Sequence, residues 1–184
     1  MSLHALLNNY FSEDINEINY KQRMLDFLNT HQNPFARSLK IGHFTASAFL
    51  LNTDKTKFLL MHHKKINLWL QPGGHCDGNP DVLAVAIKES QEESGIMEII
   101  PINTKIFDID IHTFPSNEKD PEHYHYDIRF LLKTVGNDHF IQNEESHALR
   151  WIDLYSSSEL SLEHSIKRMV HKYNHSTRHF FNLI

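Results

Sequence analysis

Strict alternation of apolar and polar residues marks one segment near the middle of the chain. The apolar residues Phe44, Ala46, Ala48 and Leu50 alternate with the polar residues His43, Thr45 and Ser47. A period of two residues predicts a β-strand whose two faces differ in polarity. The segment is therefore predicted to be a strand with one face in the core.

Other periodicities divide the rest of the chain into helices and strands. Residues 3–30 have apolar positions at helical spacing, with a cap predicted at Ser12. A second helix is predicted from Pro80 or Asp81 to Ser94, ended by Gly95 as its C-cap, and a third over about 158–173. Strands are expected at 42–50, 57–62, 97–100, 105–114, 124–134 and 148–152, the first two as a hairpin. This irregular order predicts an α+β fold in which helices cover a mixed sheet, with a helical N-terminal extension.

Composition narrows the class of protein. The 184 residues suit one domain, and the formal net charge of −5 disfavours long nucleic acid as the main partner. A single cysteine, Cys76, excludes an intrachain disulfide and a cysteine-rich zinc site. No apolar run is long enough to span a membrane, and the N-terminus does not resemble a signal peptide, so the cytoplasm is the expected compartment.

Three carboxylates gather on the second predicted helix. At 100° per residue, Glu89 and Glu93 share a stripe with Glu92 beside them, at the edge of an apolar face. Like charges so close repel, and Mg²⁺ or Mn²⁺ would relieve this because such cations prefer carboxylate oxygens. The alternative is a solvated acidic face that pairs with Lys88. The turn before the helix favours the metal, because Gly73 and its neighbour let the backbone approach a ligand closely.

The segment from Gly74 to Ile96 resembles the Nudix box in its spacing. The box motif reads Gly, five residues, Glu, seven residues, Arg-Glu, apolar, any, Glu-Glu, any, Gly, apolar, and this segment follows it without insertion. It departs from the motif at Pro80, where the box has a glutamate, at Lys88, where it has an arginine, and at Ser90, where it has an apolar residue. The resemblance implies an α/β/α sandwich, with an N-terminal extension over 1–38 and a Nudix domain over 39–184.

The resemblance also implies the site and its chemistry. Glu89, Glu92 and Glu93 would be the metal-binding and catalytic residues, with the Gly73 carbonyl as a further ligand. The reaction would be hydrolysis of a phosphoanhydride in a nucleoside diphosphate derivative or another organic pyrophosphate. Glu89 is the first candidate for the general base. Downstream acids that could serve instead are Glu118, Glu122, Glu144 and Glu145.

Polar residues alternate with apolar ones in the strand predicted at 124–134 and just before it. His123, His125, Asp127 and Arg129 would share one side, either facing water or forming a polar wall of the cleft. In the second case His123, His125 and Arg129 would contact substrate, together with His75 after the glycine turn. Two histidines at i and i+2 could instead bind a metal, but no third ligand is evident nearby in the sequence.

Three other functions compete with hydrolysis. A ligand-binding or regulatory module of the same fold would explain the departures from the box. It would not need three carboxylates that repel one another, so their presence argues against it. An isopentenyl diphosphate isomerase would need a catalytic cysteine on the opposing wall of the cleft. The only cysteine, Cys76, lies within the box loop, which disfavours this function. RNA decapping is disfavoured by the negative charge. The sequence leaves the substrate and the oligomeric state open, although the N-terminal helix could form a homodimer contact or a lid.

Overall fold

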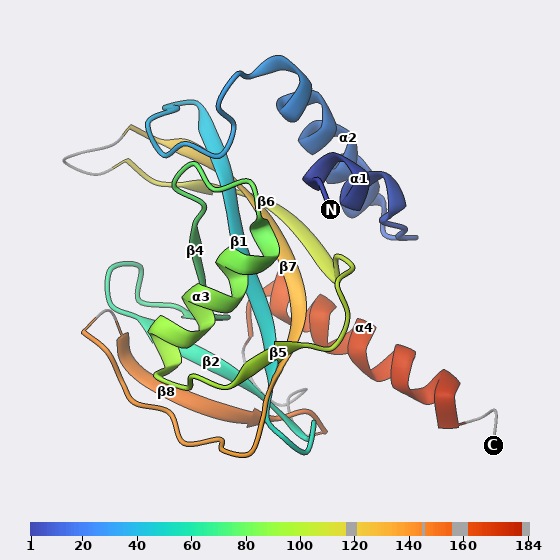
Figure 1. Cartoon of the computed structure of the whole chain (residues 1–184), viewed down its shortest axis with the longest axis vertical. Coiled ribbons are helices and arrows are strands. Elements are labelled where there is room, and N and C mark those ends of the chain that lie inside the picture. The colour runs from blue at the N-terminus through green and yellow to red at the C-terminus, as the bar shows by residue number, and fades with distance from the viewer. Residues whose placement is uncertain (117–120, 145, 156–161, 182–184) are drawn as a thin grey trace.

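A mixed β-sheet lies at the centre of the protein, as a computed structural model shows for residues 1–116, 121–144, 146–155 and 162–181 (Figure 1). The strands are β1 Gly42–Leu51, β2 Lys57–His63, β3 Trp69–Leu70, β4 Gly73–His75, β5 Ile99–Pro101, β6 Asp108–Phe114, β7 His123–Thr134 and β8 Ser146–Asp153. The helices are α1 Leu3–Asn9, α2 Ile15–Thr30, α3 Val82–Ser94 and α4 His164–Phe181. The expected strands are confirmed, with shifts of a few residues at their ends.

Strand β1 is central and pairs in parallel with β7 along its whole length, from Gly42↔Tyr124 to Leu51↔Lys133. The predicted hairpin of β1 and β2 is much shorter than expected, because the two strands pair at only one recorded position, Leu51↔Phe58. Most of β2 instead runs antiparallel to β8. The short turn joins β1 and β2 in sequence, but each strand finds its longer partner far along the chain.

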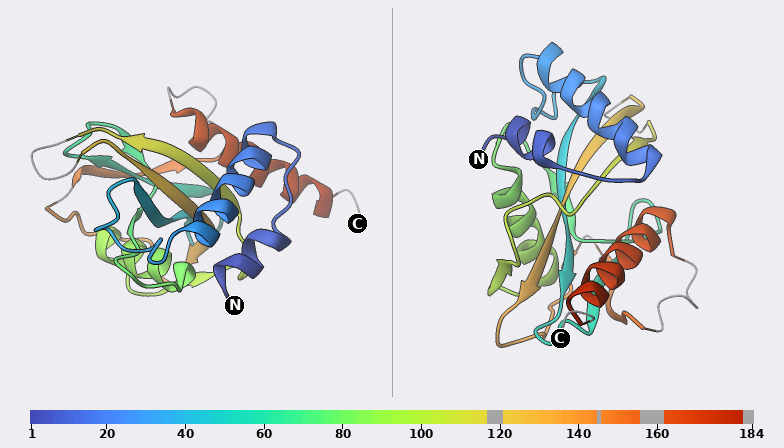
Figure 2. Two further views of the ribbon diagram at one scale, coloured as in Figure 1. Left: turned by 90° about the horizontal axis from the view of Figure 1, so that it is seen from above. Right: turned by 90° about the vertical axis from the view of Figure 1, so that its right-hand side faces the viewer.

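Helices cover both faces of the sheet, α3 on one side and α4 on the other (Figure 2, right). Phe44, Ala46 and Ala48 belong to the buried cluster that includes Val82, Val85 and Ala86 of α3, together with α1 and α2 residues. Phe49 and Leu51, which point to the opposite face, pack with Ile166, Met169 and Val170 of α4. The predicted α/β/α sandwich with a helical N-terminal extension is confirmed.

The N-terminal extension contains two helices rather than the single one predicted over 3–30. The second helix is capped by Asp14, whose Oδ1 accepts hydrogen bonds from the amides of Asn16 (2.8 Å) and Glu17 (3.2 Å). The prediction of Ser12 as the cap was wrong. Its hydroxyl is engaged by the Glu17 carboxylate, which leaves the aspartate to satisfy the free amides of the first turn.

The ends of the later helices were predicted with mixed success. Helix α3 begins after its cap Asp81 and ends at Gly95, whose φ of 70° is the left-handed geometry that glycine adopts without strain. Both ends agree with the prediction. Helix α4 runs to Phe181, beyond the predicted end at Tyr173. The predicted start near Ser158 lies outside the described residues.

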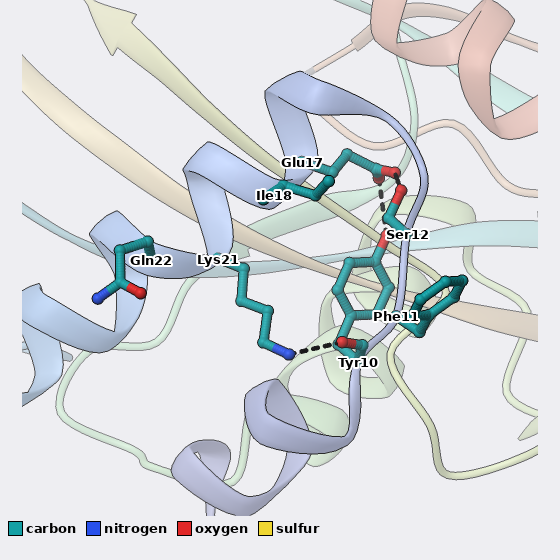
Figure 3. A pocket seen from close by; sticks show the side chains of 7 residues that line it. All are labelled: Tyr10, Phe11, Ser12, Glu17, Ile18, Lys21 and Gln22. Carbon is teal, nitrogen blue, oxygen red and sulfur yellow. Dashed lines mark hydrogen bonds between the residues drawn. The ribbon is translucent and has the colours of Figure 1, made fainter.

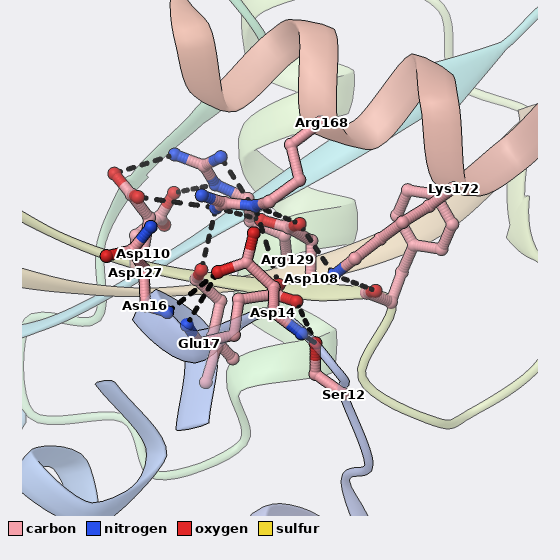
Figure 4. Close-up of polar contacts among 12 residues, drawn as sticks. Ser12, Asp14, Asn16, Glu17, Asp108, Asp110, Asp127, Arg129, Arg168 and Lys172 are labelled. Carbon is pink, nitrogen blue, oxygen red and sulfur yellow. Dashed lines mark hydrogen bonds and ion pairs between the residues drawn. The ribbon is translucent and has the colours of Figure 1, made fainter. Parts of the chain in front are cut away.

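A buried charged network joins the extension to the rest of the protein (Figure 4). We define it as Glu17, Asp108, Asp110, Asp127, Arg129, Arg168 and Lys172. Glu17 of α2 is fully buried and accepts a 2.7 Å hydrogen bond from the Tyr10 hydroxyl. Its carboxylate is also paired with Lys172 and Arg168 of α4. The extension is therefore fixed to α4 by buried ion pairs as well as by apolar contacts.

The network continues beneath α4 to β6 and β7. Asp108 is fully buried and lies 2.8 Å from both Arg168 and Lys172. Arg129, only 2% exposed, pairs with Asp127 at 2.8 Å and with Asp108 and Asp110 at 3.3 Å each. Burial alone would raise the pKa of Asp108, but the hydrogen bond from Arg168 and the nearby cations outweigh it and lower that pKa.

The network should make the stability of the fold sensitive to acid. The pKa values of Asp108 and Asp110 are lowered in the folded protein, whereas an aspartate in the unfolded chain has a pKa of about 3.9. Their stabilisation is therefore fully present above about pH 4 and is lost as the pH falls through the lower folded values. Urea denaturation between pH 6 and pH 2.5 should show this loss, with a shallower slope in Asp108→Asn. Equal slopes in the two proteins would contradict it.

Candidate active site

The glycine turn lies in a narrow space between β1 and α3. In β4, Gly73 pairs with Ser47 and Gly74 with Ala46. The amide of Gly73 donates a 2.8 Å hydrogen bond to Oε2 of Glu93. A methyl group on Gly74 would stand 2.3 Å from Oε2 of Glu89. The turn is thus held against two of the three predicted metal ligands.

Substituting the two glycines by alanine should have different effects. A Cβ at Gly73 would lie 2.6 Å from the Cα of Ser47, a backbone atom that cannot move freely. Gly73→Ala should therefore lower the free energy of unfolding by about 1–3 kcal/mol. Gly74→Ala would push only the flexible end of Glu89, so it should reduce activity while leaving stability nearly unchanged. Denaturant unfolding and turnover separate the two cases, and equal stability losses would contradict the assignment.

Glu89 and Glu93 face the glycine turn from α3, and they differ in burial from each other and from Glu92. Glu93 is 5% exposed, whereas the side chain of Glu89 is 18% and that of Glu92 58% exposed. Lys88 pairs with Glu92 at 2.7 Å and with Glu89 at 3.2 Å. Burial raises the pKa of Glu89, and the bond from Lys88 partly offsets that rise. The structure therefore contains the pairing of Lys88 with two of the acids, and the role of the three acids as metal ligands stays a prediction.

The chemistry of this donor set fits a hard divalent cation. Glu89 and Glu93 flank a glycine turn whose backbone comes within hydrogen-bonding distance, and Glu92 is open to solvent. Carboxylate and carbonyl oxygens are the ligands that Mg²⁺ and Mn²⁺ prefer. Lys88 engages one oxygen of Glu89 and one of Glu92, so each of these carboxylates keeps a second oxygen for a cation.

Two of the four alternative general bases lie within the described residues. Glu122 and Glu144 are exposed at the start of β7 and before β8. Glu118 and Glu145 lie outside the described residues. Glu89, beside the glycine turn, stays the first prediction for the base.

The polar side of β7 is buried, which rules out the interpretation that it meets water. His123 is 8% exposed, His125 7%, Asp127 3% and Arg129 2%. In the parallel register His125 lies opposite His43 of β1. The sequence showed no third ligand beside His123 and His125, but this pairing supplies one. His43, His123 and His125 each offer a ring nitrogen, and these atoms all lie within 4.8 Å of one another.

His75 completes what we call the histidine cluster: His43, His75, His123 and His125. The ring of His75 lies 5.0 Å, between centroids, from those of His43 and His125. Burial lowers the pKa of His75 to about 4 and that of His125 to about 2, and neighbouring imidazoles add to both effects. Burial also lowers the pKa of His43, although the Leu39 carbonyl partly offsets this.

Arg129 has partners that favour a structural role over the predicted contact with substrate. Its guanidinium is turned toward three carboxylates of the charged network. Gln71, which the sequence did not single out, reaches the same region through 3.3 Å hydrogen bonds to Ser47 and Asp127. Only the pairing of β1 with β7 brings these residues together, so no local pattern could have identified Gln71.

Cys76 is 3% exposed and buried in the main core. Burial raises the pKa of its thiol to about 12, so a reactive thiolate is disfavoured. Trp69 is partly buried against the second core, and the ring of His62 stacks on it at 5.0 Å. The contacts of both residues therefore favour a role in packing.

A pocket of about 370 Å³ lies on the N-terminal extension, away from these sites (Figure 3). Its lining residues are Tyr10, Phe11, Ser12, Glu17, Ile18, Lys21 and Gln22. Tyr10 donates to Glu17, and Lys21 donates to the backbone carbonyls of Asn8 and Tyr10. These polar groups hold the extension together, so the pocket is not the centre of the predicted chemistry.

The fold and the box helix define a family. The model of the NUDIX domain matches residues 42–173, most of the chain, and the protein therefore belongs to the Nudix family. A protein of Invertebrate iridescent virus 3 that is named as a hydrolase is 28% identical over 101 residues. That match covers 52% of this chain but only 42% of the viral protein.

Solved structures share the fold. An Ap4A hydrolase of C. elegans superposes with a TM-score of 0.58 at 17% identity, over 73% of this chain and 97% of its own. A MutT protein from Methanosarcina mazei gives 0.57 at 18%, over 76% and 97%. A NUDIX family hydrolase from Clostridium perfringens gives 0.54 at 25%, over 72% and 96%. In the described part of the chain, no helix has the length and apolar character needed to cross a membrane.

Proposed function

We propose that this protein hydrolyses a phosphoanhydride bond with the help of Mg²⁺ or Mn²⁺ bound at Glu89, Glu92 and Glu93. The observation that supports this most directly is the 2.8 Å bond between the Gly73 amide and the Glu93 carboxylate. It fixes the glycine turn against the acidic edge of a helix that carries the Nudix box. Named relatives of this fold are hydrolases, which agrees with the proposal.

Each residue of the site would have a distinct task. The bound cation would neutralise charge on the phosphates and lower the pKa of a water. Glu93 accepts a hydrogen bond from the Gly73 amide, which orients its carboxylate toward the glycine turn. The Gly73 carbonyl is the further oxygen ligand that we propose. Glu89 is partly buried, and burial raises its pKa, which makes it a stronger base than an exposed glutamate.

The substrate would be a nucleoside diphosphate derivative or another organic pyrophosphate. The predicted substrate contacts are still His75, His123, His125 and Arg129. The ion pairs of Arg129 argue against its contact with substrate. Cytoplasmic location and a homodimer are likewise still predictions. A panel of nucleoside di- and triphosphates, dinucleoside polyphosphates and sugar nucleotides, assayed with Mg²⁺ and with Mn²⁺, tests the proposal. No turnover of any of them would overturn it.

A binding module without catalysis is the second candidate, because Lys88 pairs with both Glu89 and Glu92. An internal cation of this kind could take the place of a metal. Calorimetry distinguishes the two candidates. Nucleotide binding that needs no divalent cation and leaves the nucleotide intact would favour the binding module.

A further inference from the structure

We propose that His43, His123 and His125 form a second metal site, for a zinc-class transition metal, separate from the acidic edge of α3. The site goes beyond the proposed function, and it stands or falls independently of hydrolysis. The three residues come from two strands, β1 and β7, which pair in parallel over ten residues. The backbone of this site is therefore held by a continuous ladder at the centre of the sheet.

The distances fit ligands that converge on one ion. One ring nitrogen from each of the three residues lies within 4.8 Å of the other two, and Nε2 of His123 is hydrogen-bonded to Nε2 of His125 at 3.1 Å. Two nitrogens bound to one tetrahedral zinc, each at 2.0–2.1 Å from it, stand about 3.3 Å apart. Small rotations of the two rings would suffice to direct both nitrogens to a shared ion.

His43 provides an independent reason to expect a ligand. It is 1% exposed, and among the described residues neither ring nitrogen meets the distance and angle of a hydrogen bond, although the nearby Leu39 carbonyl still raises the pKa of the ring. A buried polar group without a partner costs about 1–3 kcal/mol. The same ring lies 5.0 Å from both His123 and His125 between centroids. A metal bound by the three rings would give a His43 nitrogen a partner that the fold does not supply in good hydrogen-bonding geometry.

The identity of the ligands selects the class of metal. Three imidazoles with no carboxylate suit zinc, iron, nickel or copper rather than Mg²⁺, Ca²⁺ or Mn²⁺. Three histidines leave the fourth tetrahedral position for water, for an exogenous ligand or for His75, whose ring is 5.0 Å from that of His43. In this site His123 and His125 would act as metal ligands, in place of their predicted contact with substrate phosphate.

The two metal sites would lie on opposite sides of one short strand. In β4, a side chain at Gly74 would face Glu89, whereas the ring of the next residue, His75, lies against those of His43 and His125. Neighbouring residues of a strand point to opposite faces. A zinc-class ion would thus sit across the glycine turn from the acidic edge, and the two sites can be tested separately.

Zinc binding to the full-length protein, stripped with a chelator and then dialysed, tests the proposal. Zinc titration should give one tight equivalent per chain, and zinc-edge X-ray absorption of the wild type should count at least three imidazole ligands. His43→Gln, His123→Gln and His125→Gln should each weaken binding by more than about a hundredfold, because loss of a ligand exceeds the 10–100-fold effect of an outer partner.

Two control variants make the result specific. His171 and His175 are exposed on α4 with ring centroids 4.1 Å apart, a pair that could bind zinc adventitiously, so His171→Gln should leave the tight equivalent intact. Glu93→Gln should also leave it intact while impairing the proposed hydrolysis. The proposal is overturned if the wild type shows no tight equivalent or fewer than three imidazoles. It is also overturned if zinc stays in the three cluster variants, or leaves in either control. The absorption measurement needs no variant, so misfolding of a variant does not leave the question open.

Discussion

Replacing Glu93 with glutamine should lower kcat by about a hundredfold or more, because loss of a metal ligand exceeds the 10–100-fold effect of losing an outer partner of the site. Glu93 is 5% exposed and accepts a hydrogen bond from the Gly73 amide through Oε2. Glutamine has nearly the same shape and can still accept that bond through its amide oxygen. What it loses is the negative charge that we propose binds the cation.

The experiment compares turnover and the Mg²⁺ concentration needed for half-maximal rate in wild type and Glu93→Gln. Glu98→Gln is the matched control, since Glu98 is exposed just beyond the C-terminus of α3. It should change neither quantity. An active Glu93→Gln with normal dependence on Mg²⁺ would show that the acidic edge is not the site. If the wild-type protein turned over no substrate, the proposal that it is an enzyme would be contradicted instead.

Replacing Arg129 with methionine should reduce the free energy of unfolding by about 3–5 kcal/mol, the usual result of removing one partner from a buried ion pair. Arg129 is 2% exposed and pairs with Asp108, Asp110 and Asp127. Without it Asp108 and Asp110 keep the cations of α4, whereas Asp127 keeps the neutral donors of Thr45, Ser47 and Gln71. At least one would have to take up a proton or draw in water, which destabilises the folded state.

Denaturant unfolding at pH 7 measures this loss, and Arg150→Met is the matched control. The guanidinium of Arg150 lies 5.4 Å from the centroid of the partly buried Trp69 ring, and Arg150 itself is exposed. That change should cost no more than about 1 kcal/mol. A normal stability together with a large rise in KM in Arg129→Met would contradict the structural role and support the predicted contact with substrate.

Several elements could be predicted from the sequence because local chemistry determines them. The apolar residues between Phe44 and Leu50 define the faces of β1 whatever the strand pairs with. Helix α3 ends where Gly95 adopts a left-handed φ, and its spacing brings Glu89 and Glu93 to one edge. The helix break near Ser12 was missed because it depends on Glu17, whose carboxylate engages Ser12, Tyr10 and Lys172 across separate elements.

The sequence by itself determined the family, the α+β class and the row of three acids, since these follow from spacing within one helix and its preceding turn. It left His123 and His125 as a pair without a third ligand. The parallel pairing of β1 with β7 sets His43 opposite His125, although 82 residues separate them in the chain. Only the tertiary structure decides such a neighbour, because strand register depends on burial of whole faces and not on any local signal.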